Sequence, residues 1–171
     1  MKKVCIFSLI FVLGIILVWF SSPTQTNSQY LRIHIRANSN LTVDQNVKYQ
    51  VKDAVVDYMI PLLANCETIT ESKQVVGENL SQIENVAESI LRQNGFSYPA
   101  TASIKNEEFP TRSYGNLTLE SGFYDALILN LGSGCGDNWW CVVYPPLCFV
   151  NGGTHANAFK SRILEIINSI L

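Results

Sequence analysis

The stretch Tyr30-Leu31-Arg32-Ile33-His34-Ile35-Arg36-Ala37 alternates strictly between two kinds of side chain. Apolar residues occupy every second position from Leu31 onward, and Arg32, His34 and Arg36 stand between them. Since successive side chains of a strand point to opposite faces of a sheet, this pattern predicts a half-buried strand with a basic, solvent-facing outer side. The residues that follow, 38–40, are typical of a turn.

A helix is predicted after this turn. Thr42 and Gln45 have the spacing of a capping box, in which two side chains satisfy backbone groups of the first helical turn. Apolar residues then recur at intervals of three and four, while Lys48 and Lys52 flank that stripe on the expected solvent side. Pro61 predicts a kink near the end of the helix. The apolar stripe itself is typical of core packing.

A second helix and three strands follow in the predicted order. Thr68 and Glu71 form another capping box, and Gly95 suits the left-handed position after the last helical turn. From there the hydrophobic period changes to two. Three strands and a last helix are predicted, at 101–104, 122–131, 140–144 and from Thr154. The predicted fold class is α+β, a single domain with helices packed on one face of a mainly antiparallel sheet.

The chain begins with the composition of an export segment. A Lys pair precedes an uncharged apolar run at 4–20. The run is long for a cleaved signal and short for a comfortable membrane span, so residues 1–22 are predicted to be a signal peptide or a signal anchor. In both cases the Lys pair stays inside and the rest of the chain is exported. Residues 23–29 are predicted to be a linker, and residues 30–171 a single domain.

Composition excludes several classes of function. Charged residues make up 15% of the sequence and hydrophobic residues 47%, which excludes intrinsic disorder as the main description. Two of the 12 basic residues are the Lys pair of the export segment. The rest of the chain has 10 basic and 14 acidic residues, a net charge of −4. A mildly acidic domain does not bind nucleic acid through its overall field. With only two histidines, we expect no metal cluster, and we predict no cofactor and no small-molecule substrate.

Four cysteines follow the leader: Cys66, Cys135, Cys141 and Cys148. An even number in an oxidising compartment suggests pairing, and four cysteines allow three connectivities. Their spacing fits no zinc template. Cys141 and Cys148 enclose the pair Pro145-Pro146, and a chain reversal there brings two Cα atoms within disulfide range. This disulfide is therefore predicted, with Cys66 and Cys135 either free or paired second.

Two motifs suggest catalysis or phosphate binding, and both are weak. The glycine-rich segment 132–136 follows a predicted strand, but no helix and no Gly-Lys-Ser/Thr follows it, so we expect a turn. Cys141 with His34 or His155 has the residue types of a nucleophile pair, but no cysteine-protease signature surrounds them. We therefore expect no enzyme. The alternative is a small secreted cysteine-dependent peptide or cell-wall hydrolase.

The segment 138–149, NWWCVVYPPLCF, is the strongest candidate for a binding surface. Trp139 and Trp140 are adjacent in a predicted strand, so they point to opposite faces. An exposed Trp beside a rigid Pro-Pro turn is typical of an interface hot spot. The alternative, that the domain's own helices cover both indoles, is equally open. The predicted partner-binding residues are Asn138, Trp139, Trp140, Tyr144, Pro145 and Pro146, with Lys48 and Lys52 as rim charges.

Several blocks of this sequence resemble the stage II sporulation protein R family. The matching blocks, in order, are Leu31–His34, Ala37–Ser39, Asp44-Gln45, Lys48, Val51–Asp53, Phe109–Thr111, Tyr114–Leu117, Gly122–Ala126 and Asn138–Phe149. The resemblance runs from about residue 31 to 150, and its last block is long and unusual. Three departures occur: Asn40 stands where the family often has an acidic residue, Cys135 interrupts the glycine turn, and the acidic insertion of some relatives after the second cysteine is absent.

The resemblance implies signalling rather than catalysis. Proteins of this family are made in the forespore of an endospore-forming bacterium and exported into the space between forespore and mother cell. There they trigger a membrane-embedded aspartic protease of the mother cell, which cleaves the pro-form of the sigma-E transcription factor. We therefore expect this protease as partner, the membrane surface as a second contact, and a secreted or N-terminally tethered domain. A plain structural envelope protein is a third hypothesis.

Overall fold

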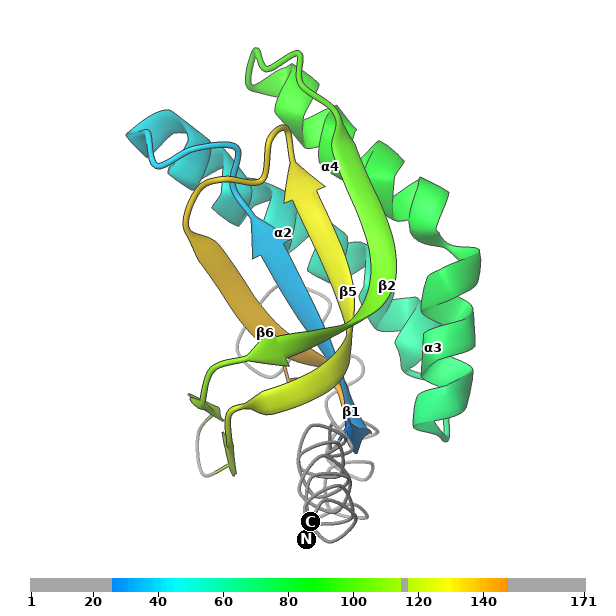
Figure 1. The fold of residues 1–171 in the computed structure, drawn as a ribbon. Helices are drawn as coiled ribbons and strands as arrows, with labels where there is room; N and C mark the ends of the chain where they lie inside the picture. Colours follow the sequence, from blue (N-terminus) through cyan, green and yellow to red (C-terminus); the bar gives the residue numbers. More distant parts are fainter. Residues whose placement is uncertain (1–25, 115–116, 148–171) are drawn as a thin grey trace, which may run out of the picture.

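The computed structural model describes residues 26–114 and 117–147, with the helices on one side of a sheet (Figure 1). In chain order the elements are β1 Thr26–Arg36, α2 Thr42–Leu63, α3 Ile69–Glu78, α4 Leu80–Gln93, β2 Ala100–Phe109, β3 Arg112–Tyr114, β4 Leu117–Leu119, β5 Gly122–Leu131 and β6 Asn138–Tyr144. Four strands form one sheet in the order β2-β5-β1-β6, and β3 pairs with β4 in a separate hairpin. Only the β1–β5 pair of the large sheet is parallel. The predicted α+β class is confirmed.

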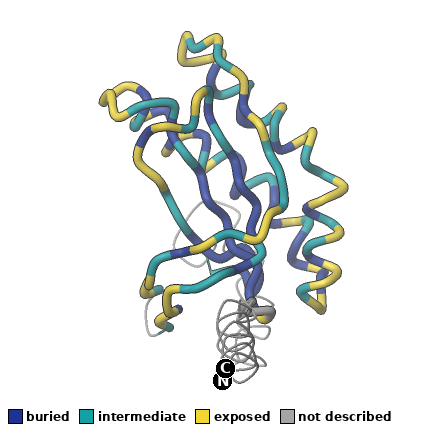
Figure 2. Tube along the Cα trace, viewed as in Figure 1, coloured by how far each residue is buried: buried dark blue, intermediate teal, exposed yellow. Residues whose placement is uncertain are grey.

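The sheet buries both of its faces. On the helical side, Leu31, Ile33 and Ile35 of β1 pack with the apolar stripes of α2 and α4 in the larger core cluster. The smaller cluster on the other side has no member from a described helix. Its buried members are Tyr30, Phe109, Leu119, Tyr124, Ala126, Ile128 and Val142. Figure 2 shows the central strands buried and the outward sides of the helices exposed.

Strand β5 lies inside the sheet, between β1 and β2. Its apolar residues are divided between the two clusters: Leu127 and Leu129 belong to the larger one, Ala126 and Ile128 to the smaller one. The continuous apolar run at 126–129 is therefore covered on both faces, as in a strand inside a sheet.

The prediction that β1 has a solvent-facing basic side is wrong. Arg32 is fully buried, His34 is 5% exposed and Arg36 is half-buried. The rings of Phe109 from β2 and Tyr124 from β5 lie 4.2 Å and 4.8 Å from the guanidinium carbon of Arg32. Alternation shows which side chains share a face, but it does not show whether distant residues cover that face.

Helix α2 begins differently from the prediction. Leu41 is the residue before its first turn and provides no side-chain cap. The Gln45 amide donates to the Ser39 carbonyl at 2.8 Å instead of completing a box with Thr42. The Asp44 carboxylate is buried and accepts hydrogen bonds from the side chains of Asn38, Ser39 and Tyr98. This cluster ties the helix start to the turn after β1.

The second predicted helix consists of two helices. The Thr68 hydroxyl accepts the Glu71 N–H at 3.1 Å, which confirms this helix start. The helix breaks at Asn79, whose side-chain oxygen accepts a hydrogen bond from Tyr58 of α2 at 2.8 Å. Gly95 has a φ of 81°, as predicted for the residue after the last turn of α4.

The ends of several strands differ from the predictions. β1 begins at Thr26, inside the predicted linker, because Thr26 already pairs with β5. β2 extends to Phe109, and the β3–β4 hairpin was not predicted. The leader, Cys148 and the predicted helix from Thr154 lie outside the described residues. Within the described ranges, no helix is long and apolar enough to cross a membrane.

Candidate functional site

Residues Asn138–Tyr144 of the candidate segment form β6, the strand at one end of the sheet order. In the pairing of β1 with β6, Trp139 lies opposite Ile35, and Trp140 lies opposite His34. Trp139 therefore faces the helices and Trp140 faces the other side of the sheet, as the sequence predicted. Both indoles are half-buried, so each keeps part of its surface for a partner.

Trp139 is packed against the larger cluster and against one cation. The ammonium nitrogen of Lys52 lies 5.6 Å from the centroid of its ring. Lys52 also pairs with the neighbouring carboxylate of Asp53. Lys52 therefore lies beside the aromatic segment, and its role as a rim charge of an interface stays a prediction.

Trp140 has a different set of neighbours on the opposite face. The guanidinium carbon of Arg112, from β3, lies 4.5 Å from its ring centroid. The imidazole of His34 lies 5.3 Å away at an interplanar angle of 31°. Each tryptophan is thus accompanied by one cation, Lys52 on the helical side and Arg112 on the other. Sequence reasoning missed Arg112, because the hairpin that carries it was not predicted.

Lys48 does not lie on the surface, contrary to the prediction. It is 1% exposed, and its ammonium group donates to the Gln45 side chain at 2.7 Å and to the Asp137 carbonyl at 3.0 Å. Burial lowers the pKa of Lys48, and the charge of Asp137 opposes this effect. Lys48 joins α2 to the loop before β6, which is a structural role.

Residues 144–146 of the candidate segment are also covered. Tyr144 is 3% exposed, Pro145 and Pro146 are buried, and the Tyr144–Pro145 peptide bond is cis. Asn138, at the start of β6, is exposed. The predicted residues that remain accessible are therefore Asn138, Trp139, Trp140 and Lys52.

Cys141 is disulfide-bonded and 6% exposed, whereas Cys66 and Cys135 are free. Because Cys148 lies outside the described residues, its pairing with Cys141 stays a prediction. Cys141 belongs to the cluster on the helical side, and His34 points to the opposite side. The Cys141–His34 nucleophile pair is therefore not formed.

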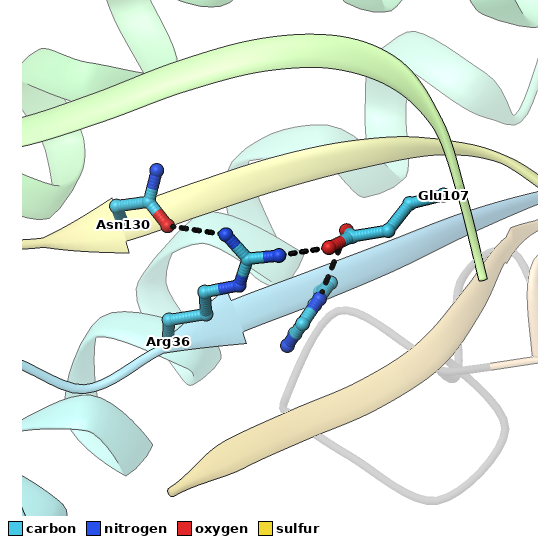
Figure 3. A network of polar contacts seen from close by, with 4 residues as sticks. Arg36, Glu107 and Asn130 are labelled. Atoms are coloured by element: carbon cyan, nitrogen blue, oxygen red, sulfur yellow. Dashed lines mark hydrogen bonds and ion pairs between the residues drawn. The ribbon is translucent and has the colours of Figure 1, made fainter. Parts of the chain in front are cut away.

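A polar network lies on the face of the sheet that the described helices do not cover (Figure 3). Glu107 of β2 pairs with Arg36, and the Arg36 guanidinium also donates to the Asn130 side chain at 3.4 Å. The other carboxylate oxygen of Glu107 lies 3.1 Å from Nδ1 of His34. Burial chiefly, with the charges of Arg36 and Arg32, lowers the pKa of His34 to about 4, against a raising effect of the Asn138 side chain. The imidazole is neutral at neutral pH.

The glycine-rich segment is a turn, as predicted, and holds no phosphate-loop geometry. Gly132 and Gly134 have φ values of 57° and 63°, which favour glycine. The Ser133 N–H donates to the Asn38 side chain at 3.0 Å, and the Ser133 hydroxyl donates to the Asn38 carbonyl at 2.6 Å. This turn packs on the turn after β1. Within residues 26–114 and 117–147, no group of three or more metal-ligating side chains is found.

Fold and surface together define a small α+β domain with an aromatic, partly exposed strand at the end of its sheet. The family model for stage II sporulation protein R (spore_II_R) matches residues 27–154. Stage II sporulation protein R of Bacillus subtilis (strain 168) is 33% identical over 131 residues, which are 77% of this chain and 58% of that protein. No solved structure matches.

The chain belongs to the stage II sporulation protein R family, and its role is therefore in sporulation. It spans 58% of the length of the curated relative that it matches.

Proposed function

We propose that this protein is a secreted signal of endospore formation. Exported from the forespore, or tethered to its membrane by the N-terminal segment, it activates a membrane-embedded aspartic protease of the mother cell. That protease then cleaves the pro-form of sigma-E. The proposal assigns no catalytic step to the chain itself, and family membership supports the sporulation context.

The observation that carries the proposal is the pair of half-buried tryptophans on β6. Trp139 and Trp140 emerge on opposite sides of the strand, and each indole has a cation beside it. Tryptophan is enriched among interface hot spots, because it contributes a large apolar area and is desolvated when a partner covers it. The attraction between a cation and an aromatic ring becomes stronger when a partner excludes water from the contact. β6 therefore offers a partner two anchoring side chains.

The cysteine-dependent hydrolase has no support from the geometry around Cys141. The sulfur of Cys141 is buried and bonded in a disulfide, and the imidazole of His34 lies across the sheet from it. A nucleophile needs a base within hydrogen-bond reach. Cys141 is better explained as a structural residue.

Reconstitution in a host that does not sporulate tests the proposal. The full chain is co-expressed with the protease and with pro-sigma-E, and processing is followed by immunoblot. We expect cleavage only when all three proteins are present and the chain is exported. Cleavage that does not depend on the chain contradicts the proposal and favours a structural envelope protein.

Replacing residues 1–22 by an unrelated cleavable signal separates export from tethering. If secretion is what the signal requires, this exchange preserves processing. If processing survives only with an uncleavable anchor, the secreted form of the proposal is wrong.

A further inference from the structure

Arg32 is the most unusual buried side chain of the described residues. It has no exposed surface, and it lies on the face of the sheet that the described helices do not cover. Its Nη2 donates to the Tyr114 hydroxyl at 2.8 Å, whereas Nε and Nη1 are buried without any hydrogen-bond partner. The rings of Phe109, Tyr124 and Tyr114 lie 4.2, 4.8 and 5.9 Å from the guanidinium carbon.

No carboxylate of the described residues forms an ion pair with Arg32. The acidic side chain on the same face, Glu107, is occupied by Arg36 and His34. Burying a cation without an anion is costly, and buried guanidinium N–H groups without acceptors add to that cost. Aromatic faces compensate only a part of it, since cation–π contacts are weaker than ion pairs with good geometry. A fold that needed only a large apolar residue here gains nothing from arginine.

We propose that Arg32 binds a carboxylate, and that a protein partner supplies it. This partner is the protease of the proposed function, and only this second part of the inference rests on that proposal. The planar guanidinium has two edges that each present a pair of parallel N–H donors. One edge is formed by Nη1 and Nη2, and the other by Nε and Nη2, so Nη2 belongs to both. A carboxylate that replaces the Tyr114 hydroxyl therefore makes two parallel hydrogen bonds where the hydroxyl makes one.

Tyr114 also gives the route by which a carboxylate reaches Arg32. Of the three aromatic residues around the guanidinium, Phe109 and Tyr124 are fully buried, whereas Tyr114 is only half-buried. It is the most distant of the three rings, and its hydroxyl is the group to be displaced. A change of the Tyr114 rotamer opens the edge of the guanidinium that its hydroxyl now occupies.

A thermal-melting experiment tests the site without the protease. The full chain in non-ionic detergent is melted in increasing sodium acetate, with sodium chloride at equal ionic strength as reference. We expect the melting temperature to rise with acetate for the wild type, to rise more for Tyr114→Phe, which lacks the competing hydroxyl, and to stay flat for Arg32→Met. Arg36→Met is the matched control, because Arg36 already has a carboxylate partner, and its acetate response is retained.

Two outcomes overturn the site. If the wild type, Tyr114→Phe and Glu165→Gln all lack an acetate-specific shift, Arg32 is a structural cation, whether or not Arg32→Met folds. The sequence has one acidic side chain outside the described residues, Glu165. If acetate raises the melting temperature of the Glu165→Gln variant but not that of the wild type or Tyr114→Phe, the carboxylate of Glu165 fills the site. No partner is then needed.

The reconstituted processing reaction tests the source of the carboxylate. We expect a folded Arg32→Met variant to lose most of its activation of the protease while Arg36→Met keeps it. Full activation by Arg32→Met overturns the partner part of the inference and leaves the proposed function standing. If the wild type itself fails to activate, the proposed function is wrong, and the acetate titration still decides the site.

Discussion

Lys52 lies against Trp139, with its ammonium nitrogen 5.6 Å from the centroid of the indole. The contact joins the middle of α2 to β6 at the end of the sheet, so the indole is fixed from the helical side. The Lys52 side chain is 24% exposed, and its ammonium group also forms an ion pair with Asp53. A partner that covers Trp139 therefore also removes water from the cation, which strengthens a cation–π contact.

Removing either indole is expected to reduce signalling. Trp139→Ala and Trp140→Ala should each weaken protease activation by about 2 kcal/mol, or roughly thirty-fold, as hot-spot tryptophans do. Pro-sigma-E processing measures the activity and circular dichroism measures the fold. Since both indoles are half-buried, at least one variant should stay folded. Trp139→Phe keeps a ring and should retain most of the activity. If both alanine variants unfold, the tryptophans are core residues.

The two lysines of α2 are expected to differ. Lys48→Met should destabilise the fold by about 1–3 kcal/mol in urea denaturation, because the Asp137 carbonyl loses a buried donor. Lys52→Ala should change stability by less than about 1 kcal/mol, since its ion pair with Asp53 is partly exposed. It should weaken activation mildly and in a salt-dependent way. A Lys48→Met protein of normal stability that no longer signals would place Lys48 in the recognition surface instead.

Periodicity predicted most elements of the fold, since it records which side chains share a face. Gly122–Leu131 was predicted with its observed bounds, and the opposite orientation of Trp139 and Trp140 followed from their adjacency. The break at Asn79 was missed, because the apolar spacing of three and four continues through it. The hairpin of β3 and β4 was missed, because strands of three residues are too short to show a period.

Burial of polar residues is the main feature that the sequence did not predict. Arg32, His34 and Lys48 look like surface residues by type, and each is buried by residues distant in the chain. The partner of Arg32 at 2.8 Å is Tyr114, and that of His34 at 3.1 Å is Glu107. Such pairs depend on sheet register, which a single sequence does not show. The strand that carries the candidate site was predicted, whereas the residues that pack around its tryptophans were only partly identified.

Two glycine-to-alanine substitutions should have opposite effects. A Cβ at position 136 would overlap the carbonyl oxygen of Ser39, so Gly136→Ala should cost about 2 kcal/mol by forcing two turns apart. A Cβ at Gly77, in α3, would lie 3.6 Å from Ile104 Cδ1, an ordinary contact. Gly77→Ala should stabilise by up to about 1 kcal/mol, because alanine favours the helix. Urea denaturation measures both. Equal stability of Gly136→Ala and the wild type would show that the turns can separate freely.

The Cys141–Cys148 disulfide is expected in oxidised protein. Cys141 is disulfide-bonded, and Cys66 and Cys135 are free. Intact mass with and without reductant should show a gain of two hydrogens on reduction, and peptide mapping should recover a linked peptide containing both cysteines. Alkylation of Cys141 without prior reduction would rule the bond out.

The stability of the fold should fall between pH 7 and pH 5 because of His34. Its pKa in the folded state is about 4, below the ordinary value of 6.5, and its side chain is 6% exposed. Below about pH 6.5 the unfolded chain binds a proton that the folded chain does not, so stability is present above this pH and is lost as the pH falls toward 4. The loss by pH 5 is about 2 kcal/mol. Urea denaturation of the wild type and His34→Gln measures it, with His155→Gln as control. An equal pH dependence in wild type and His34→Gln would show that His34 is not the titrating group.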